Sequence, residues 1–362
     1  MTDTEKVLEY KCPCCNAPLI FGQDQQKMVC EYCDNTFEME AVKAYNTPAE
    51  APDEQTSESE QATTSQWSEE DQEVVRTYTC SSCGGELITD DNTAATFCPY
   101  CDNPTIIQGR LSGGIRPDGV LPFKNGKEEA KAAFRKLCKG KLLLPKGFDS
   151  DVRVEKITGM YVPFWLYNCT SHIDGKYNAT RSSSWSDSKY NYVRTDYYSI
   201  LRVADATFSN IPMDASSKLS NTIMESIEPF DFSQVVDFET AYLSGYFADK
   251  YDVEAETGFD RIKQRVTSTM DQKVRETITG FSGVSTVHRN VTVDQKTPKY
   301  VLLPVWMLYT KFKDKTYVFA MNGQTGKMTG TFPICPKKSA MWFSGICAGV
   351  TLLATIVQLL AF

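Results

Sequence analysis

The amino-acid sequence predicts a mixed α+β protein with two small cysteine-rich modules at its N-terminal end and one apolar helix at its C-terminal end. Three observations support this prediction. One frame of four cysteines occurs twice before residue 109, a Pro-x-Trp strand pattern occurs twice between residues 150 and 335, and the last 23 of the 362 residues carry no charge. A chain of this length has room for two or three domains and at least one sizeable hydrophobic core.

Both cysteine-rich modules have the spacing C-x2-C-x14-C-x2-C, and each cysteine of the first recurs 68 residues later in the second. Neighbouring Tyr, Leu, Asp and Asn residues repeat at the same offset, which indicates an internal duplication. Two cysteines separated by two residues let a tight turn direct both sulfurs at one ion, and a second turn completes a tetrahedral thiolate site. The predicted metal ligands are Cys12, Cys15, Cys30 and Cys33 in the first module and Cys80, Cys83, Cys98 and Cys101 in the second.

Zinc is the metal that this spacing favours, with one ion in each module. Segments of about 35 residues bury too little apolar surface to fold alone, and structural zinc supplies roughly 10–16 kcal/mol at neutral pH. An iron–sulfur centre would also take four thiolates, but the paired turns favour zinc. Cys14 could replace Cys12 or Cys15, although only the latter two match the second module. We therefore predict zinc ribbons at residues 1–45 and 76–109.

The cysteine content also indicates the compartment. The N-terminal residues MTDTEKVLEYKCPCC are polar and contain no signal-peptide core, so we expect the folded parts to stay in the cytoplasm. Thiols are kept reduced there, and thirteen cysteines are then expected to bind metal before they form disulfides.

Charge is distributed unevenly along the chain, whose net charge is −8. Residues 46–75 carry nine acidic and no basic residues and are rich in Pro, Ser and Thr, which predicts a disordered acidic linker and makes the first ribbon a mobile, tethered module.

Residues 110–149 form a basic connector. A helix is expected from about Lys127 to Lys139, with Ala130, Ala133, Phe134 and Leu137 on its apolar face. The rest of its surface is basic and would either face water or contact an anionic membrane surface or nucleic acid. The basic residues of that surface are Lys131, Arg135, Lys136 and Lys139.

Residues 150–335 predict an α+β domain with two related Trp-containing β-hairpins in one sheet. Each hairpin has a Pro-x-Trp strand, a short polar turn and a returning strand. The Pro-x-Trp residues are Pro163 with Trp165 and Pro304 with Trp306, and the returning strands pass through Tyr177 and Tyr317. A long polar helix is expected from Glu254 to Thr279, with Ile262, Val266, Met270 and Val274 facing inward.

The sequence contains no recognised catalytic motif, so we expect no enzymatic activity and identify no small-molecule substrate. His172 and His288 are its two histidines, and neither lies in a known motif. The chain has no G-x-x-x-x-G-K-[ST], G-x-S-x-G or H-E-x-x-H pattern. Its Trp and Tyr residues are better explained as core residues and sheet pairs than as a ligand cage.

Residues 340–362 predict a transmembrane tail anchor. At 1.5 Å per residue this segment spans about 34 Å, enough for a hydrocarbon core of about 30 Å. A buried core helix would be shorter and would carry a polar stripe. Lys337 and Lys338 precede it and favour the cytoplasmic side, so we expect a single-pass protein of the cell membrane. Gly345 and Gly349 form a G-x-x-x-G, a weak signal for helix pairing.

The chain resembles the TFIIB-type zinc-ribbon-containing proteins of Gram-positive bacteria over nearly its whole length. The resemblance rests on YKCPCCNAPLIF, GMYVPFWLY and LPVWMLYTKFKDKTYVFAMNGQTGKMTG, followed by the apolar segment. It implies a membrane-associated scaffold or adaptor, because genes of this family often lie beside those for PspA-like envelope-stress proteins and membrane proteins of the SPFH and TPM types. It implies no catalytic residue.

Members of this family are also often labelled PriA-like primosomal helicases. This sequence differs from a helicase, because it has no nucleotide-binding loop and is too short for the motor. The second module also departs from the usual C-P-x-C opening and reads CSSCGG.

Two functions follow as expectations. The first is a non-enzymatic, tail-anchored adaptor that binds other proteins, possible partners being PspA-like or SPFH-type, at the cytoplasmic face of the membrane. The alternative is a membrane-tethered zinc-ribbon protein that binds nucleic acid, in replication or a primosome. Phosphate contact requires clustered Lys and Arg, whereas the two ribbon segments carry net charges of −4 and −3, so charge favours the adaptor.

Overall fold

The computed structural model describes residues 7–46, 115–150, 154–312 and 315–361, together with four short strands between residues 76 and 107. Nearly all of the predicted acidic linker lies outside the described residues. The four predicted ligands of the second module also lie outside them: Cys80, Cys83, Cys98 and Cys101.

The N-terminal module is a small three-stranded sheet followed by a helix. The elements are β2 (Ile20–Gly22), β3 (Lys27–Val29), β4 (Thr36–Phe37) and α1 (Met39–Asn46). Before them, β1 (Val7–Leu8) pairs with a strand of the second cysteine-rich segment. That segment contributes β5 (Arg76–Thr79), β6 (Glu86–Thr89), β7 (Thr93–Phe97) and β8 (Pro104–Ile107).

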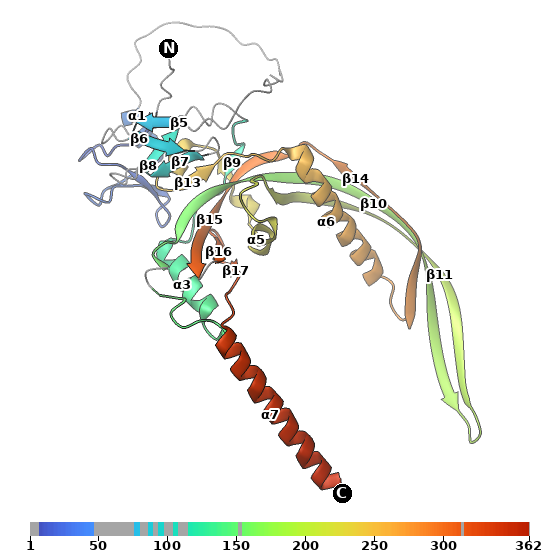
Figure 1. The fold of residues 1–362 in the computed structure, drawn as a ribbon. Coiled ribbons are helices and arrows are strands. Elements are labelled where there is room, and N and C mark those ends of the chain that lie inside the picture. Colours follow the sequence, from blue (N-terminus) through green and yellow to red (C-terminus); the bar gives the residue numbers. More distant parts are fainter. Residues whose placement is uncertain are drawn as a thin grey trace.

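A twelve-stranded sheet runs through the rest of the described chain and contains its longest strands (Figure 1). Its centre is antiparallel and consists of β11 (Asn191–Asp214), β10 (Thr158–Ser186) and β15 (Lys299–Phe312). β15 continues into β16 (Lys315–Asn322) and β17 (Met328–Gly330), and β14 (Gly283–Gln295) pairs with the outer half of β10. Three short strands join near the cysteine modules: β9 (Gly119–Val120), β12 (Val236–Asp237) and β13 (Phe247–Asp249).

The sheet is buried on both faces where β10 and β15 pair. Strands buried on both faces are typically nearly continuous apolar runs, as MYVPFWLY and YVLLPVWML are in this chain. One face buries Tyr161, Trp165, Tyr300 and Trp306. The opposite face buries Val162, Phe164, Leu303 and Val305, and α5 (Asn221–Ser226) packs there.

The tryptophans of the two Pro-x-Trp strands are core residues. The indole Nε1–H of Trp165 donates to the carbonyl oxygen of Val253, and that of Trp306 donates to the carbonyl oxygen of Asn125, both at 2.8 Å. Both rings are about 4% exposed. A buried indole needs such an acceptor, so each tryptophan also ties a neighbouring loop to the sheet.

The turn of the first predicted hairpin was placed wrongly. A short polar turn was expected between the Trp165 strand and a returning strand through Tyr177, but β10 continues without a turn to Ser186. Polar and buried residues keep alternating through this stretch, with Ile173 and Tyr177 both fully buried. The two-residue period therefore prevails over the Asp-Gly turn signal. The second predicted hairpin is present as β15 and β16, which returns through Tyr317.

The outer halves of β10 and β11 form a long curved arm, defined as residues 169–208, and α6 (Ala255–Glu276) lies along it (Figure 1). The predicted inward face of this helix is confirmed, since Ile262, Val266, Met270 and Val274 are all buried.

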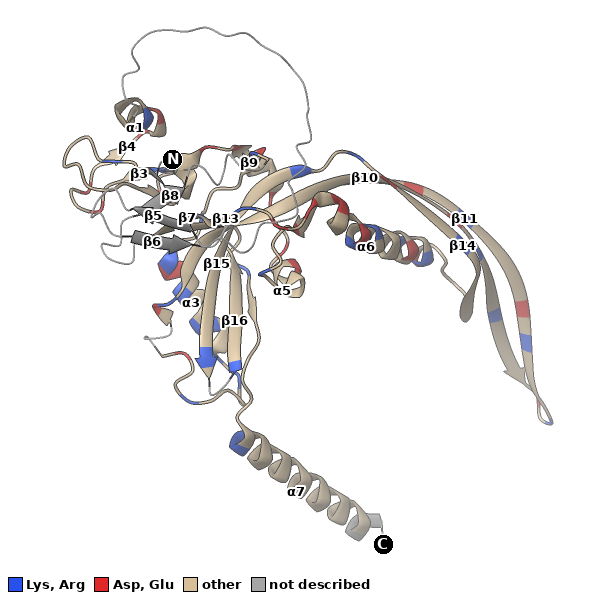
Figure 2. Ribbon diagram, turned by 45° about the horizontal axis from the view of Figure 1, so that its top comes forward, with Lys and Arg blue, Asp and Glu red and all other residues tan. Residues whose placement is uncertain are grey.

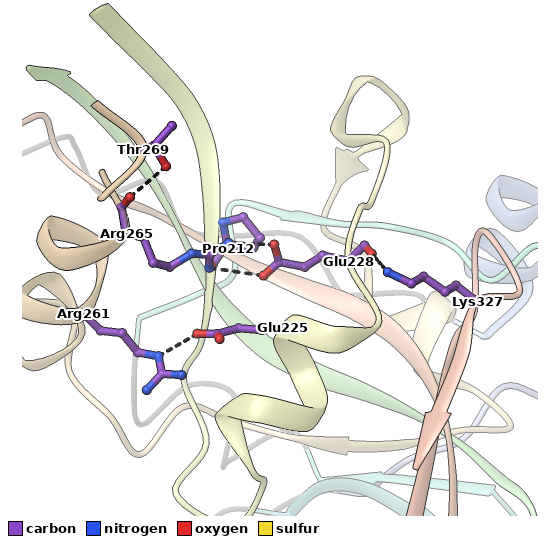
Figure 3. A network of polar contacts seen from close by, with 7 residues as sticks. All are labelled: Pro212, Glu225, Glu228, Arg261, Arg265, Thr269 and Lys327. Carbon is purple, nitrogen blue, oxygen red and sulfur yellow. Dashed lines mark hydrogen bonds and ion pairs between the residues drawn. The ribbon is translucent and has the colours of Figure 1, made fainter. Parts of the chain in front are cut away.

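Ion pairs hold α6 to the base of the arm (Figure 3). Arg265 donates to the carbonyl oxygen of Pro212 at 3.0 Å and pairs with Glu228 at 2.8 Å, while Arg261 pairs with Glu225 at 2.6 Å.

The segment expected to be a connector supplies core residues of the same domain. Its helix is α3 (Lys127–Cys138), close to the predicted bounds, and it buries Ala130 and Phe134. Phe123 packs against Tyr161, Tyr246 and Trp306.

Lys131 does not belong to the exposed basic surface predicted for this helix. It is only 7% exposed and pairs with Glu128 at 2.7 Å and with Glu155 at 2.8 Å.

The C-terminal helix, α7 (Pro336–Ala361), leaves the body and packs against nothing along its apolar length (Figure 1). Its stretch from Pro336 to Gln358 is long and apolar enough to cross a membrane, and the described side chains of its apolar part, from Ala340 on, are exposed. Two short 3-10 helices complete the described elements, η1 (Phe232–Gln234) and η2 (Thr240–Leu243).

Candidate metal centre

Four thiols of the first module lie close enough together to bind one metal ion. The sulfur atoms of Cys12, Cys15, Cys30 and Cys33 are all within 4.8 Å of one another. The Cys12–Cys33 and Cys15–Cys30 sulfur distances are 3.6 Å and 3.4 Å. Four thiolates held about 2.3 Å from a tetrahedral ion would be about 3.8 Å apart, so this donor set fits such an ion.

Each pair of cysteines lies on a tight turn of the same construction. The N–H of Asn16 donates to the carbonyl oxygen of Cys12, and the N–H of Asp34 donates to that of Cys30, both at 2.9 Å. Asn16 and Asp34 have φ angles of 61° and 56°. Asn and Asp adopt this left-handed conformation more readily than most residues, so the local sequence favours both turns.

Two N–H groups donate to sulfur atoms of the cluster. The backbone N–H of Cys14 lies 3.4 Å from the sulfur of Cys12, and the side-chain amide of Asn35 lies 3.3 Å from that of Cys33. Hydrogen bonding from the Asn35 backbone lowers the pKa of the Cys33 thiol to about 7. Since the thiolate is the form that binds metal, the low pKa favours ligation by Cys33. At Cys15 the lowering hydrogen bond from the Ala17 backbone is outweighed by desolvation and by bonds to the other three thiols, so the pKa of that thiol is instead raised to about 12.

The structure separates Cys14 from the cluster. Its side chain is exposed, and its sulfur is not among the four that converge. The group of four is the one that the comparison of the two modules had favoured.

The first module packs firmly against the main domain. Its interior is apolar, with Leu19, Met28 and Val42 fully buried. Phe21 is 1% exposed and meets the ring of Tyr242 edge-on at 4.9 Å between centroids. The core of this module is thus continuous with that of the main domain.

Hydrogen bonds and an ion pair reinforce this junction. Ser244 exchanges two bonds with the module: its hydroxyl donates to the carbonyl oxygen of Leu19 at 2.6 Å, and its own carbonyl accepts from the N–H of Phe21 at 3.0 Å. Tyr10 bonds Thr240 at 2.7 Å. The other contacts across the junction are Tyr246 with Gln23, Gln26 with Phe123 and Lys43 with Glu239. The prediction of a mobile, tethered first module is therefore wrong.

Two strand pairings of the first module recur among the described strands of the second segment at the same offset of 68. Met28 pairs with Phe37 in the first module, and Thr96 pairs with Thr105 in the second. Lys11 bridges Pro18, and Thr79 pairs with Glu86. The duplication seen in the sequence thus extends to strand register.

The second segment is also attached to the main sheet. β7 pairs with β13 through Ala95 and Ala248, and β1 of the first module pairs with β8. A cleft of about 520 Å³ lies where both modules and the main sheet meet, and its aromatic lining is Tyr32, Phe97, Phe247 and Trp306.

The sequence did not identify the residues that dock the first module. Thr240, Ser244 and Tyr246 lie in a short irregular stretch more than 190 residues after the last cysteine of that module. Ser and Tyr in such a stretch resemble ordinary loop residues, and only their partners in space reveal their role.

Comparison with known proteins gives one informative relative. The chain is 35% identical to the uncharacterized protein YdjG of Bacillus subtilis (strain 168) over 354 residues, which is 98% of each chain. No protein-family model matches the chain, and no solved structure matches it. An identity of this size over the full length of both chains establishes common ancestry, so the protein belongs to the YdjG family.

Proposed function

We propose that this protein is a non-enzymatic adaptor of the TFIIB-type zinc-ribbon class, anchored in the cell membrane by α7. Its folded parts lie at the cytoplasmic face and bind other membrane-associated proteins. The observation that carries the membrane assignment is the exposure of α7. An apolar helix with no protein against it would be poorly soluble in water, and a bilayer removes that cost.

Contacts at the start of α7 support a fixed connection between anchor and body. The N–H of Cys335 donates to the carbonyl oxygen of Leu143 at 2.8 Å, and the Lys338 ammonium donates to that of Leu144 at 2.6 Å. Lys141 lies over the ring of Phe332 at 5.1 Å. The loop after α3 therefore packs against the segment that leads into the helix.

Lysines gather at this end of the body, which supports a cytoplasmic orientation. Figure 2 shows basic residues at the ends of β15 and β16, on α3 and at the start of α7. Lys and Arg next to a membrane span favour the cytoplasmic side, and each adds about 1 kcal/mol of attraction to anionic lipid. Lys337 and Lys338 lie in the first turn of α7, and Lys141 lies over Phe332, just before it. Lys311 and Lys315 lie where β15 ends and β16 begins.

We assign zinc to the first cluster because closed sets of four thiolates on paired tight turns are typical of structural zinc. A second zinc site at Cys80, Cys83, Cys98 and Cys101 is supported by the conserved offset of strand register. Gly84 corresponds to Asn16, whose φ is positive, and glycine adopts that conformation at no steric cost. The CSSCGG opening is thus compatible with the same turn.

The nucleic-acid alternative is weakened by the pairing of the basic residues of the first module. Lys11, Lys27 and Lys43 each form an ion pair, with Glu9, Glu38 and Glu239 respectively. Counterion release from phosphates requires cationic groups that are free to contact them. We therefore rank protein binding first and keep nucleic-acid binding as an outcome to be tested.

Fractionation of cells tests the membrane anchor. The full chain should stay with membranes through a high-salt wash and be released by detergent. The double variant Val350→Arg/Leu353→Arg should move to the soluble fraction, because each arginine at the helix centre costs about 2.5–3.5 kcal/mol. Ser339→Arg, at the start of the helix, is the matched control and should remain with membranes. Wild-type protein in the soluble fraction would overturn the proposal.

Capture of the detergent-solubilised full chain tests the adaptor role. PspA-like or SPFH-type proteins are the expected partners, and their capture together with the full chain should require the two zinc ribbons. Salt-titrated binding to a DNA fragment addresses the alternative: micromolar affinity with a steep salt dependence would reverse the ranking.

A further inference from the structure

The tip of the arm, residues 183–194, is an unusual part of the surface. The last pair between β10 and β14 is Thr180 with Gly283, so beyond it the arm consists of two strands only. Every side chain from Arg181 to Thr195 is exposed. A two-stranded hairpin is at best marginally stable in water by itself, and this one extends beyond the strand and helix that support the rest of the arm.

The turn at the tip is nevertheless well organised. The carboxylate of Asp187 accepts hydrogen bonds from the N–H groups of Lys189 and Tyr190, both at 2.8 Å, and from the hydroxyl of Tyr192 at 3.0 Å. The backbone of Asp187 also bonds that of Tyr190 at 3.0 Å. The backbone bond from Lys189, above all, lowers the pKa of Asp187, so the carboxylate stays charged and the turn stays closed at physiological pH.

This turn presents three large aromatic rings to the surroundings. Trp185 and Tyr192 are opposite one another and stack at 5.6 Å with 12° between their planes, while Tyr190 lies 6.3 Å from Tyr192. Trp185 is 54% and Tyr190 is 64% exposed. An exposed apolar cluster held in a fixed geometry at the end of a long projection indicates a contact surface.

A lipid headgroup region is the partner that this chemistry fits. Trp and Tyr are enriched where membranes meet water, because each ring is apolar at one end and polar at the other. Lys189 adds a cationic group suited to anionic lipid, whereas the neighbouring Arg194 already pairs with Asp196 at 3.0 Å. The hairpin cannot enter the hydrocarbon core, because its unpaired backbone edges would lose their hydrogen bonds to water.

The direction and reach of the arm agree with such a contact. In both views the arm curves toward the side to which α7 runs (Figures 1 and 2). From Cys169 to Ser186, β10 spans about 56 Å at about 3.3 Å per residue, and the 26 residues of α7 span about 39 Å. The tip of the arm and α7 thus extend to the same side of the body (Figures 1 and 2).

We propose that the aromatic tip formed by Trp185, Tyr190 and Tyr192 is a second membrane contact, which inserts into the headgroup region of the bilayer that anchors α7. The inference rests on the membrane anchor of the proposed function. Two separated contacts fix the tilt of the body, because a single spanning helix can tilt in the bilayer and the body, which is held at the start of α7, tilts with it. The arm then acts as a strut that holds the ribbons at a defined height above the lipid.

Photo-crosslinking of the full chain in nanodiscs of phosphatidylglycerol and phosphatidylethanolamine tests this proposal. The variant Tyr190→p-benzoylphenylalanine should form lipid adducts detectable by mass spectrometry. The same replacement at Trp342, within α7, is the positive control. Replacement at Tyr45, which is 55% exposed on α1 at the opposite end of the molecule, is the negative control.

The tip aromatics should be required for the adduct. Adding Trp185→Ser/Tyr192→Ser to the Tyr190 reporter should lower the lipid adduct severalfold. Tyr197→Ser is the matched control, because Tyr197 is 82% exposed on the opposite face of the arm, and it should leave the adduct unchanged. Circular dichroism of each variant checks that the fold is retained.

The outcomes separate the two proposals. Lipid adducts at Trp342 but none above the Tyr45 level at Tyr190 would overturn the arm contact and leave the anchor standing. No adduct at Trp342 would overturn the anchor itself. Adducts of Tyr190 with a second protein chain in place of lipid would also overturn the arm contact and assign the tip to protein docking. Nanodiscs of phosphatidylcholine alone should give fewer Tyr190 adducts, because the cationic side chain of Lys189 then has no anionic lipid to contact.

Discussion

The hydroxyl of Ser244 donates a hydrogen bond to the carbonyl oxygen of Leu19 at 2.6 Å, across 225 positions of the chain. Ser244 is 3% and Leu19 is 0% exposed, so neither group can turn to water instead. This single bond lies at the centre of the junction between the first cysteine module and the main domain.

Ser244→Ala should loosen that junction. The substitution leaves a buried carbonyl oxygen without its donor, which typically costs about 1–3 kcal/mol. We expect faster hydrogen exchange in β2 and β3 of the first module in the detergent-solubilised chain, with little change in α6. Ser226→Ala is the control, because the exposed hydroxyl of Ser226 bonds the carbonyl oxygen of Thr222 within α5. Unchanged exchange in β2 would show that the other contacts of the junction hold the module without this bond.

Metal content should follow the cysteine sets. We expect two zinc ions per chain by elemental analysis of the purified protein, and one after Cys30→Ser, because a set of three thiolates with one Ser binds zinc far more weakly. Cys14→Ser should retain both ions. One ion in the wild-type chain would contradict a site in the second module, and loss of metal in Cys14→Ser would contradict the assigned ligand set.

Asp214 should make the protein less stable as the pH rises. Its side chain is 3% exposed, and within the part of the chain that the structure describes neither carboxylate oxygen has a hydrogen-bond partner beyond its own residue. Burial raises its pKa from 3.8 to about 6. The folded state therefore binds the proton more tightly than the unfolded state. This stabilisation is complete below about pH 4 and is lost as the pH rises through 6, a change of about 3 kcal/mol at most.

Urea unfolding of the detergent-solubilised chain at pH 5 and pH 7 measures this effect. Asp214→Asn should be more stable than the wild type at pH 7 and should reduce the difference between the two pH values. Asp174→Asn, at an exposed position of the arm, should leave that difference intact. The comparison with Asp214→Asn isolates this carboxyl group from the others that titrate between pH 5 and pH 7. Equal differences between the two pH values in the wild type and in Asp214→Asn would contradict the prediction.

Arg265→Met should detach α6 from the base of the arm. The guanidinium bonds Glu228 and the carbonyl oxygen of Pro212, and all three groups are at least partly buried. The substitution leaves the partly buried carboxylate of Glu228 without the cation that compensates its desolvation. We therefore expect a loss of about 2–3 kcal/mol in unfolding free energy. Lys273→Met, which removes an exposed pair with Glu276, should cost less than about 1 kcal/mol. Equal losses would show that the Arg265 pair contributes nothing beyond surface charge.

Patterns that depend on neighbouring residues were predicted well. The inward face of α6 follows from apolar residues at helical spacing, and the cysteine turns follow from C-x2-C followed by Asn or Asp. The exposed apolar helix α7 follows from 23 residues without charge. Each of these features is set by local geometry, so the residues that predict it lie within a few helical turns or one strand of one another.

The predictions were wrong where packing in the folded chain prevailed over a local sequence signal. Asp174 and Gly175 are typical of a turn, yet β10 passes through them because Ile173, Tyr177 and Ala179 continue the buried side of the strand. Lys131 resembled an exposed helix residue, but Glu155 from outside the helix holds it inward. In both cases the packing partner, which is distant in sequence, decided the outcome.

The duplicated cysteine frame, the apolar C-terminal helix and the faces of the long helix could be read from the amino-acid sequence, since spacing and hydrophobicity act between near neighbours. The docking of the first module through Ser244 and Tyr246, and the extension of β10 and β11 into an arm with an aromatic tip, became visible only in the folded chain. Those features arise from contacts between segments up to 230 residues apart, where the free energy of burial depends on which surfaces meet. A linear pattern records that a residue is apolar or polar, and the fold supplies the surface against which it packs.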